Sequence, residues 1–301
     1  MEKDINKLIR GTACHDQFRF FAVNTTQVVQ TMLNLHKSSP ASTLLLGRLL
    51  TGALLMGADL KEEDASLTLN IEAEGPLKGA IAIYEQKGKV RGYAKNPMYF
   101  DEDIQNNLLI GKLLGKGTLN VIKDLHLKAP MTGTIELVTG EVAEDIARYF
   151  LRSEQIPTAI SLGVLFDKDM IIRSAGGYLI QQMPSAAPKD AEALINNLAN
   201  TPYITDLLDM GLDWEKILAK FIFKDMDWSV NDSIPVEYLC TCSKERFANA
   251  LRLLGKTELE TMNTGIAPVC HYCNTEYIFT PEDISNIIST LKDKRVKHAK
   301  D

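Results

Sequence analysis

The sequence predicts an α+β protein with three parts: an N-terminal domain of mostly antiparallel sheet with packed helices, a helical linker, and a small C-terminal module. Segments that alternate apolar and polar residues dominate residues 1–184, as expected for half-buried strands. Short amphipathic helices dominate residues 185–235. Four of the five cysteines then lie in two tight pairs within residues 236–291. A basic tail, residues 292–301, ends the chain and is expected to fray.

Turn residues and hydrophobic patterns locate the elements of the first domain. Residues 77–85 and 89–97 are predicted to be the arms of a hairpin, because a glycine-containing turn separates them. The other predicted elements are a strand at 15–23, a helix at 25–36, strands at 65–73, 117–124 and 131–138, a helix at 141–155, and two strands between 157 and 184.

The segment 41–60 is predicted to be a long apolar helix. Ser39 can cap it, and Pro40 suits its first turn. Its length and composition would also suit a membrane span, but Arg48 lies near its middle. Because a charge at that depth is costly in lipid, we interpret the segment as a buried core helix and expect no membrane association.

The predicted linker consists of short helices separated by breaks at Pro202 and Gly211. No segment of this length remains helical alone in water, so these helices must pack on another surface or be ready to detach from it. Their apolar positions are Leu194, Leu198, Leu207, Leu208, Trp214, Ile217, Leu218, Phe221 and Ile222.

Two cysteine pairs carry the strongest chemical signal. Cys240 and Cys242 form a C-x-C pair, and Cys270 and Cys273 form a C-x-x-C pair. Two close pairs from separate turns are a common ligand set of tetrahedral zinc, so we predict that the four thiolates bind one zinc ion. The C-x-C pair can reach one metal only if the backbone turns there, because in an extended strand the side chains of residues two apart are roughly 7 Å apart. Between the pairs, a helix is predicted to stop at Gly255.

Other interpretations of the cysteines remain open. Permanent disulfides are one, although no secretory segment is visible and the cytoplasm, where we expect this protein, keeps thiols reduced. Buried, unreactive cysteines are another, and His271 is a possible substitute ligand. Cys14 stands alone among apolar residues, and we interpret it as a small core residue.

The small size of the module around the cysteine pairs, together with the chemistry of thiolates, favours a redox switch. Modules of this size often need a metal to fold, and structural zinc supplies roughly 10–16 kcal/mol in such cases. Thiolates are also the atoms that oxidants attack, and both C-x-x-C and C-x-C can close a disulfide. Oxidation would therefore remove the metal and unfold the module.

Charge argues against nucleic acid as a partner. The formal net charge of the chain is −6. Residues 236–301 contain nine Lys or Arg and nine Asp or Glu, so the main alternative, a nucleic-acid-binding zinc module, lacks a basic stripe.

The sequence contains no convincing catalytic motif. In "GKLLGKGT", Gly111 and Gly115 are one residue too close for a phosphate loop, and Gly117 replaces the required Ser or Thr, so we interpret it as a turn. We interpret Gly176–Gly177 as a hairpin turn. A thiol–disulfide oxidoreductase would need one exposed thiolate of low pKa rather than four metal ligands. We therefore expect a protein that is not an enzyme.

The cysteine pattern and several other blocks resemble the family of redox-regulated heat shock chaperones, the 33 kDa chaperonins. The resemblance covers nearly the whole chain. The blocks that carry it are "LLLGRLLTGALLMGADLK", "LTLNIEAEGPLKGAIAIYE", "VRGYAKNP", "LLGKGTLNVIKD", "YFLRSEQIPTAI", "AGGYLIQQMP", "CTCSKERFANALRLLG" and "CHYCNTEYIF".

This resemblance implies a mechanism. The reduced form would hold zinc on all four cysteines and be inactive. Under oxidative stress with unfolding conditions, Cys270 and Cys273 would pair first, and Cys240 and Cys242 would follow. Zinc would leave and the helical linker would loosen. The active form, often a homodimer, would hold unfolding client proteins without ATP, and we expect clients on the linker and on the apolar surface beneath it.

Overall fold

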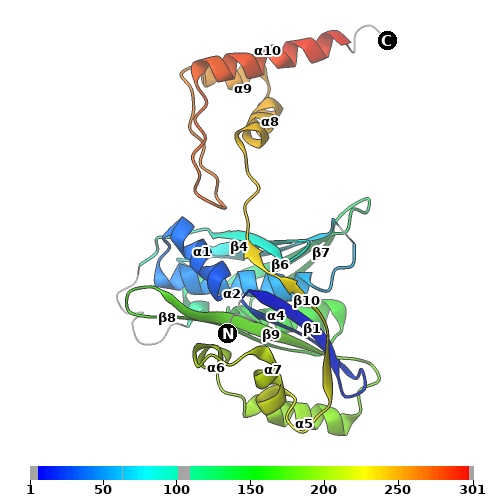
Figure 1. Ribbon diagram of the computed structural model, residues 1–301. Coiled ribbons are helices and arrows are strands. Elements are labelled where there is room, and N and C mark those ends of the chain that lie inside the picture. Colours follow the sequence, from blue (N-terminus) through cyan, green and yellow to red (C-terminus); the bar gives the residue numbers. More distant parts are fainter. Residues whose placement is uncertain (1–5, 63, 101–108, 298–301) are drawn as a thin grey trace. The chain divides into compact units, whose positions relative to one another are not determined.

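The computed structural model describes residues 6–62, 64–100 and 109–297, with side chains as far as Leu291 (Figure 1). The described chain is α+β, which confirms the predicted class. It divides into two compact units, residues 1–239 and residues 240–301. The predicted linker, residues 185–235, thus lies inside the first unit.

The first unit is built on two sheets. The first sheet has the order β10-β1-β2-β9-β8 and is antiparallel throughout. The second has the order β11-β5-β4-β3-β6-β7 and is antiparallel except where β11 joins β5. The strands are β1 (Lys7–Ala13), β2 (Phe18–Asn24), β3 (Ser66–Ala73), β4 (Gly79–Glu85), β5 (Lys89–Ala94), β6 (Gly117–Asp124), β7 (Met131–Glu136), β8 (Thr158–Phe166), β9 (Ile172–Gln182), β10 (Trp228–Pro235) and β11 (Glu237–Tyr238).

Helix α2 (Pro40–Gly57) forms the centre of the main core, packed against strands of both sheets. Its start follows the prediction: the Ser39 hydroxyl accepts a hydrogen bond from the Ser42 N–H, and Pro40 occupies the first turn. The helix is long and apolar enough to cross a membrane, but 89% of it is buried inside the protein. Arg48 pairs with Glu141 at 2.6 Å, which satisfies the charge within the fold.

Other helices complete this side of the first unit. They are α1 (Thr26–His36), α3 (Ile110–Leu114), α4 (Val142–Tyr149) and the π-helical turn η2 (Phe150–Glu154). Gly115, with φ of 65°, ends α3, so the glycine-rich segment "GKLLGKGT" is a short helix followed by the start of β6 rather than a phosphate loop.

A helical layer, residues 188–222, covers the other face of the first sheet (Figure 1). It contains α5 (Pro188–Ala199), α6 (Ile204–Asp209), α7 (Trp214–Ile217) and the π-helical turn η3 (Leu218–Ile222), and the predicted breaks at Pro202 and Gly211 are confirmed. Its buried side chains pack on apolar residues of β1, β2 and β9 in a second core. These short helices therefore owe their stability to the sheet beneath them.

Parts of the first sheet differ from the prediction. Strand β1 was not predicted, and the prediction of a strand from residue 15 is wrong, because residues 14–17 form a turn. Gly176 and Gly177 do not form a hairpin turn, since both lie inside β9 and pair with β2 and with β8. A Cβ atom on Gly177 would lie 2.3 Å from the Ser161 carbonyl oxygen, so close strand approach is the reason for glycine there.

The end of the predicted helical linker is also different. Residues 228–235 form strand β10, paired with β1, rather than a continuation of the helices. Few of its residues favour a strand, so the local pattern gave no signal, and pairing with a distant segment determines its conformation.

The second unit contains three helices among its described residues: α8 (Lys244–Leu254), α9 (Lys256–Thr261) and α10 (Pro281–Lys297). Gly255, with φ of 83°, ends α8 as predicted. Residues 292–297 belong to α10, so this part of the predicted frayed tail is helical, and residues 298–301 lie outside the described chain. The buried core is small and consists of Leu251, Leu259, Phe279, Ile284 and Ile287.

Candidate metal centre

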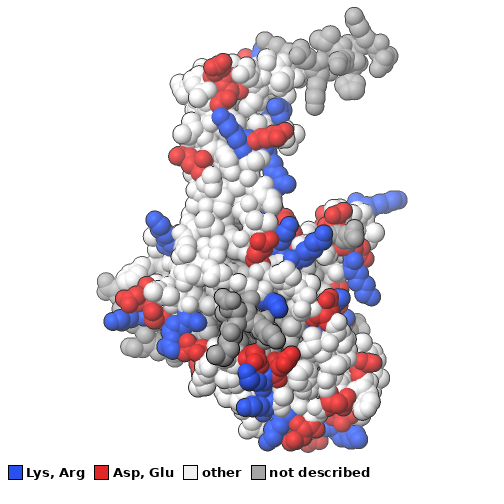
Figure 2. Space-filling model, in the orientation of Figure 1, with Lys and Arg blue, Asp and Glu red and all other residues white. Residues whose placement is uncertain are grey.

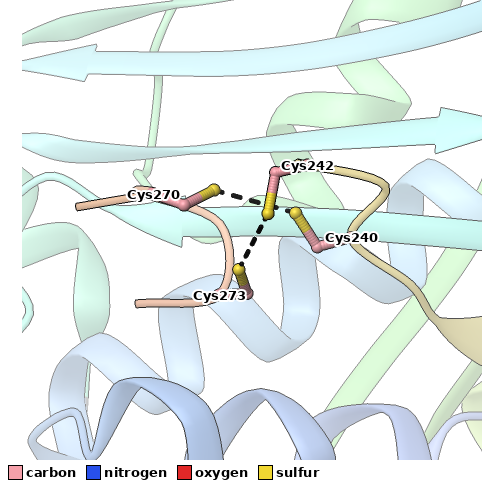
Figure 3. Close-up of side chains that lie close together, drawn as sticks. All are labelled: Cys240, Cys242, Cys270 and Cys273. Carbon is pink, nitrogen blue, oxygen red and sulfur yellow. Dashed lines mark hydrogen bonds between the residues drawn. The ribbon is translucent and has the colours of Figure 1, made fainter. Parts of the chain in front are cut away.

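The structure brings the four predicted cysteines together within the second unit (Figure 3). The sulfur atoms of Cys240, Cys242, Cys270 and Cys273 all lie within 4.8 Å of one another, and all four are free thiols. The first pair lies in the segment between β11 and α8, and the second lies in the turn before α10. His271 is not part of this cluster.

Local backbone structure places each pair. Residues 239–243 are not in a strand, and the Cys240 and Cys242 sulfurs lie within 4.8 Å of each other, closer than the roughly 7 Å between residues two apart along a strand. The Ser243 hydroxyl accepts a hydrogen bond from the Arg246 N–H at 3.2 Å and starts α8 directly after the pair. The C-x-x-C pair lies on a turn in which Asn274 has φ of 55° and its N–H donates to the Cys270 carbonyl at 2.8 Å.

The sulfur spacing fits a tetrahedral metal ion. Four sulfurs bound about 2.3 Å from one zinc ion lie about 3.8 Å from one another. The Cys240 and Cys270 sulfurs are 3.7 Å apart, and the Cys242 and Cys273 sulfurs are 3.3 Å apart (Figure 3). Four thiolates at this spacing suit zinc in ligand type, number and geometry.

The four thiols differ in their surroundings. Burial raises the pKa of Cys240 and of Cys270 above the ordinary value of a thiol. Burial acts in the same direction on Cys273, but hydrogen bonds from Thr275 and from the neighbouring thiols outweigh it and lower its pKa to about 7. The cluster without metal therefore contains one thiol that ionises readily next to two that resist ionisation.

Two hydroxyl groups that were not predicted as part of the site lie within hydrogen-bond distance of cysteine sulfur atoms. The Tyr277 hydroxyl lies 3.1 Å from Cys242 Sγ, and the Thr275 hydroxyl lies 3.2 Å from Cys273 Sγ. The sequence feature that could have identified these two hydroxyls is the stretch "CNTEY", in which Thr275 and Tyr277 follow Cys273 by two and four residues. The chain turns back on itself at this place. Hydrogen bonds of this kind orient the ligands of a metal and lower their reactivity.

Replacement of Tyr277 by phenylalanine is expected to speed the attack of peroxide on the loaded centre. The ring and its packing against Phe247 remain, while the hydrogen bond to Cys242 is lost. Because a hydrogen bond to a charged group contributes about 1.5 kcal/mol, the rate of zinc release should rise by about tenfold. A coloured chelator measures that rate, and Tyr203→Phe is the control, because Tyr203 is an exposed tyrosine of the first unit. Equal rates in Tyr277→Phe and the unsubstituted protein would contradict the expectation.

The fifth cysteine lies outside the centre. Cys14 is buried in the core beneath the helical layer, which confirms the predicted core position. Burial also raises the pKa of its thiol, as expected for an unreactive cysteine.

The chain connects the metal centre directly to a buried anchor in the first unit. Tyr238, in β11, precedes Cys240 by two residues. Its hydroxyl donates to the Gly92 carbonyl at 2.8 Å and lies 3.1 Å from His36 Nε2. These contacts hold the chain against the second sheet just before the first metal ligand.

Comparisons with known proteins find relatives over nearly the whole chain. The Hsp33 protein family matches residues 6–280. A 33 kDa chaperonin of Desulforamulus reducens is 40% identical over 291 residues, which cover 95% of this chain and 98% of the relative. A 33 kDa chaperonin of Lachnoclostridium phytofermentans is 39% identical over 286 residues, which cover 94% of this chain and 98% of the relative.

A solved structure shows the same architecture. The crystal structure of a 33 kDa chaperonin (heat shock protein 33 homolog) from Thermotoga maritima matches with a TM-score of 0.88 and 34% identity over 96% of this chain and 99% of that chain. The resemblance seen in the sequence is thereby confirmed, and the chain belongs to the Hsp33 family of chaperones, the 33 kDa chaperonins.

Proposed function

We propose that this protein is a redox-regulated holdase chaperone that works without ATP. The observation that carries the proposal is the cluster of four free thiols within 4.8 Å of one another, in a unit whose described side chains form a fully buried core of five residues. Because so small a core is marginal by itself, the ligands of a metal hold the second unit together in the reduced, inactive state.

Zinc is the proposed ion, held by Cys240, Cys242, Cys270 and Cys273. When bound, it keeps the four sulfurs as thiolates and joins the segment before α8 to the turn before α10. Structural zinc supplies roughly 10–16 kcal/mol of apparent folding free energy in small modules, which exceeds what this core could provide.

Oxidation by a peroxide is the proposed trigger. One thiolate of a pair attacks the peroxide and becomes a sulfenic acid, and the second thiol of the pair then displaces water from it. Each disulfide thus consumes one peroxide and releases two waters. We propose the pairs Cys270–Cys273 and then Cys240–Cys242, as the resemblance to the family implies. Pairing of sequence neighbours also suits a module that begins to unfold, because short loops close at low entropic cost.

The reduced cluster itself would allow other pairs, since the Cys240 sulfur is near Cys270 and the Cys242 sulfur is near Cys273. Mass spectrometry of digested, oxidised protein separates the two possibilities. Peptides that join residues 240–242 to 270–273 would contradict the proposed pairing and leave the switch itself intact.

Loss of the metal frees the chain that leads back to the helical layer. We propose that the predicted linker, residues 185–235, then loosens from the core domain, residues 1–184, while residues 236–291 unfold as the switch and 292–301 follow as a tail. Apolar side chains of the layer and of the sheet beneath it would bind clients. The layer side chains that would become accessible are Leu194, Ile204, Leu207, Trp214, Ile217, Leu218 and Ile222.

The partners of the active form are therefore unfolding proteins in the cytoplasm, with a second copy of the chain as a possible homodimer partner. The surface charge supports protein clients over nucleic acid, because basic and acidic side chains alternate over the visible face in Figure 2. The formal net charge of −6 agrees with this.

Light scattering of a heat-unfolding client protein tests the proposal. We expect that reduced, zinc-loaded protein leaves the scattering unchanged, whereas protein treated with peroxide at mildly elevated temperature suppresses it in the absence of ATP. Equal suppression by both forms, or by neither, would show that the metal is only structural here.

A further inference from the structure

Strand β10 is the edge of the first sheet and is held mainly by its backbone. Among the described strands it pairs only with β1, in antiparallel register from Lys7–Pro235 to Ala13–Trp228. All five side chains of residues 229–233 are exposed. Only Trp228 and Ile234, near the two ends, pack partly against the cores.

The pairing of β10 is weak along its middle. Arg10 pairs with Asp232 and Gly11 pairs with Val230, so Asn231 bulges out without an opposite residue. The ion pair between Arg10 and Asp232 spans 2.9 Å, but both side chains are about half exposed, and such pairs contribute little. Ser, Asn and Asp, which fill most of this stretch, are poor strand formers.

The edge of β1 contacts the backbone of the neighbouring strand closely and does not depend on particular side chains of that strand. A Cβ atom on Gly11 would lie 2.0 Å from the Ser229 carbonyl oxygen, so glycine allows the neighbouring strand to approach. The other side of β1 is occupied by β2 in a regular ladder. If β10 leaves, β1 keeps its conformation and presents a row of unpaired N–H and C=O groups.

We propose that the free edge of β1 is a binding site for extended segments of unfolding proteins, which add to the sheet as antiparallel strands in the place of β10. The inference rests on the proposed function, because β10 must be released by the switch. Strand addition draws its affinity from main-chain hydrogen bonds that every polypeptide can make. One edge could therefore hold clients of unrelated sequence, with β10 as the occupant that blocks it at rest.

The chain itself links the switch to this edge. Strand β10 is followed at once by β11 and, two residues after Tyr238, by the ligand Cys240. At its other end β10 continues from the helical layer. Loosening of the layer would thus remove the restraint at one end of a strand that is weak in its middle. At the other end, unfolding of the second unit leaves only the short β11 and its Tyr238 anchor, which must also leave β5 for β10 to be released.

A disulfide that ties β10 to β1 tests the site. Thr12 and Ser229 are partners in the antiparallel register, and the Cα separation of such partners lies within the range that a disulfide spans. After peroxide treatment, Thr12→Cys/Ser229→Cys should suppress client scattering at least fivefold less than the unstapled protein. The matched control is Asn120→Cys/Thr134→Cys, which ties β6 to β7 and should behave like the unstapled protein. Peptide mapping verifies that each staple and each native pair has formed.

The staple separates this inference from the proposed function. The helical layer lies before residue 229 in the chain and can still detach in the stapled protein. Full client suppression by Thr12→Cys/Ser229→Cys would therefore overturn the inference and leave the holdase intact, with the layer as its client surface. If the staple abolishes dimerisation but leaves client capture unchanged, then β10 of a second copy, rather than a client, occupies the edge of β1 in the unstapled protein. That result would also overturn the inference. No suppression by any oxidised variant, stapled or not, would overturn both proposals.

A peptide with the sequence of residues 228–235 gives an independent measurement. It should compete with clients for the oxidised protein, and it should protect the amides of residues 7–13 from hydrogen exchange. The same peptide with alternate amides N-methylated keeps every side chain but cannot complete the ladder, so it should not compete. Competition by both peptides, or by neither, would contradict strand addition.

Discussion

Cys270→Ser is expected to unfold the second unit, loosen residues 185–235 and leave the core domain, residues 1–184, folded. Cys270 is 4% exposed and supplies one of four candidate metal ligands. Without it a tetrahedral site is incomplete, and most of the roughly 10–16 kcal/mol that structural zinc supplies is lost. The first unit has its own two cores, which contain no residue of the second unit.

Hydrogen exchange with peptide resolution measures the outcome. Amides of residues 244–297 should exchange as in an unfolded chain and those of residues 185–235 should lose protection, while those of α2 and of β3 to β7 keep theirs. Metal analysis should find about one zinc ion in the native protein and none in the variant. Treatment of the native protein with a strong chelator should reproduce the same exchange pattern.

Cys14→Ser is the matched control, because it also removes a buried thiol but lies in the core beneath the helical layer. It should keep both the zinc and the protection of residues 244–297. Protection of the second unit that persists in Cys270→Ser would mean that its small core is sufficient and that the metal does not govern folding.

Trp214→Ala is expected to loosen the helical layer in the reduced, metal-bound protein. Trp214 is 1% exposed and lies at the centre of the core between the layer and the first sheet. Its indole N–H has no hydrogen-bond partner in the described part of the protein, so its contribution is apolar packing. Replacing a buried tryptophan by alanine costs about 3–5 kcal/mol, which is enough to release helices this short.

Two measurements check this result. Residues 188–222 should lose protection in hydrogen exchange, and the reduced variant should suppress client scattering that the unsubstituted reduced protein does not. Ile195→Ala is the control within the same layer, since Ile195 is 64% exposed and its loss should change stability by less than about 0.5 kcal/mol. If Trp214→Ala still needed peroxide for client capture, loosening of the layer would not be the step that activates the protein.

Much of the fold could be predicted from local sequence. The cap formed by Ser39 and Pro40, the hairpin of β4 and β5, and the breaks at Pro202 and Gly211 follow from turn chemistry and periodicity, and the structure confirms them. The metal centre could also be predicted, because ligand type and close spacing within each cysteine pair are written in consecutive residues. In these places neighbours in the chain are also neighbours in space.

The remaining features depend on segments that are far apart in the sequence. Strand β10 has a poor strand pattern, and β1, more than two hundred residues away, gives it its conformation. Gly176 and Gly177 have the composition of a turn, yet strands on both sides hold them extended. The sequence by itself determined most helices and strands of this protein and the two cysteine pairs that the structure brings together. Only the tertiary structure decided which strand covers the edge of β1, because backbone pairing is open to any extended segment that the rest of the fold brings alongside.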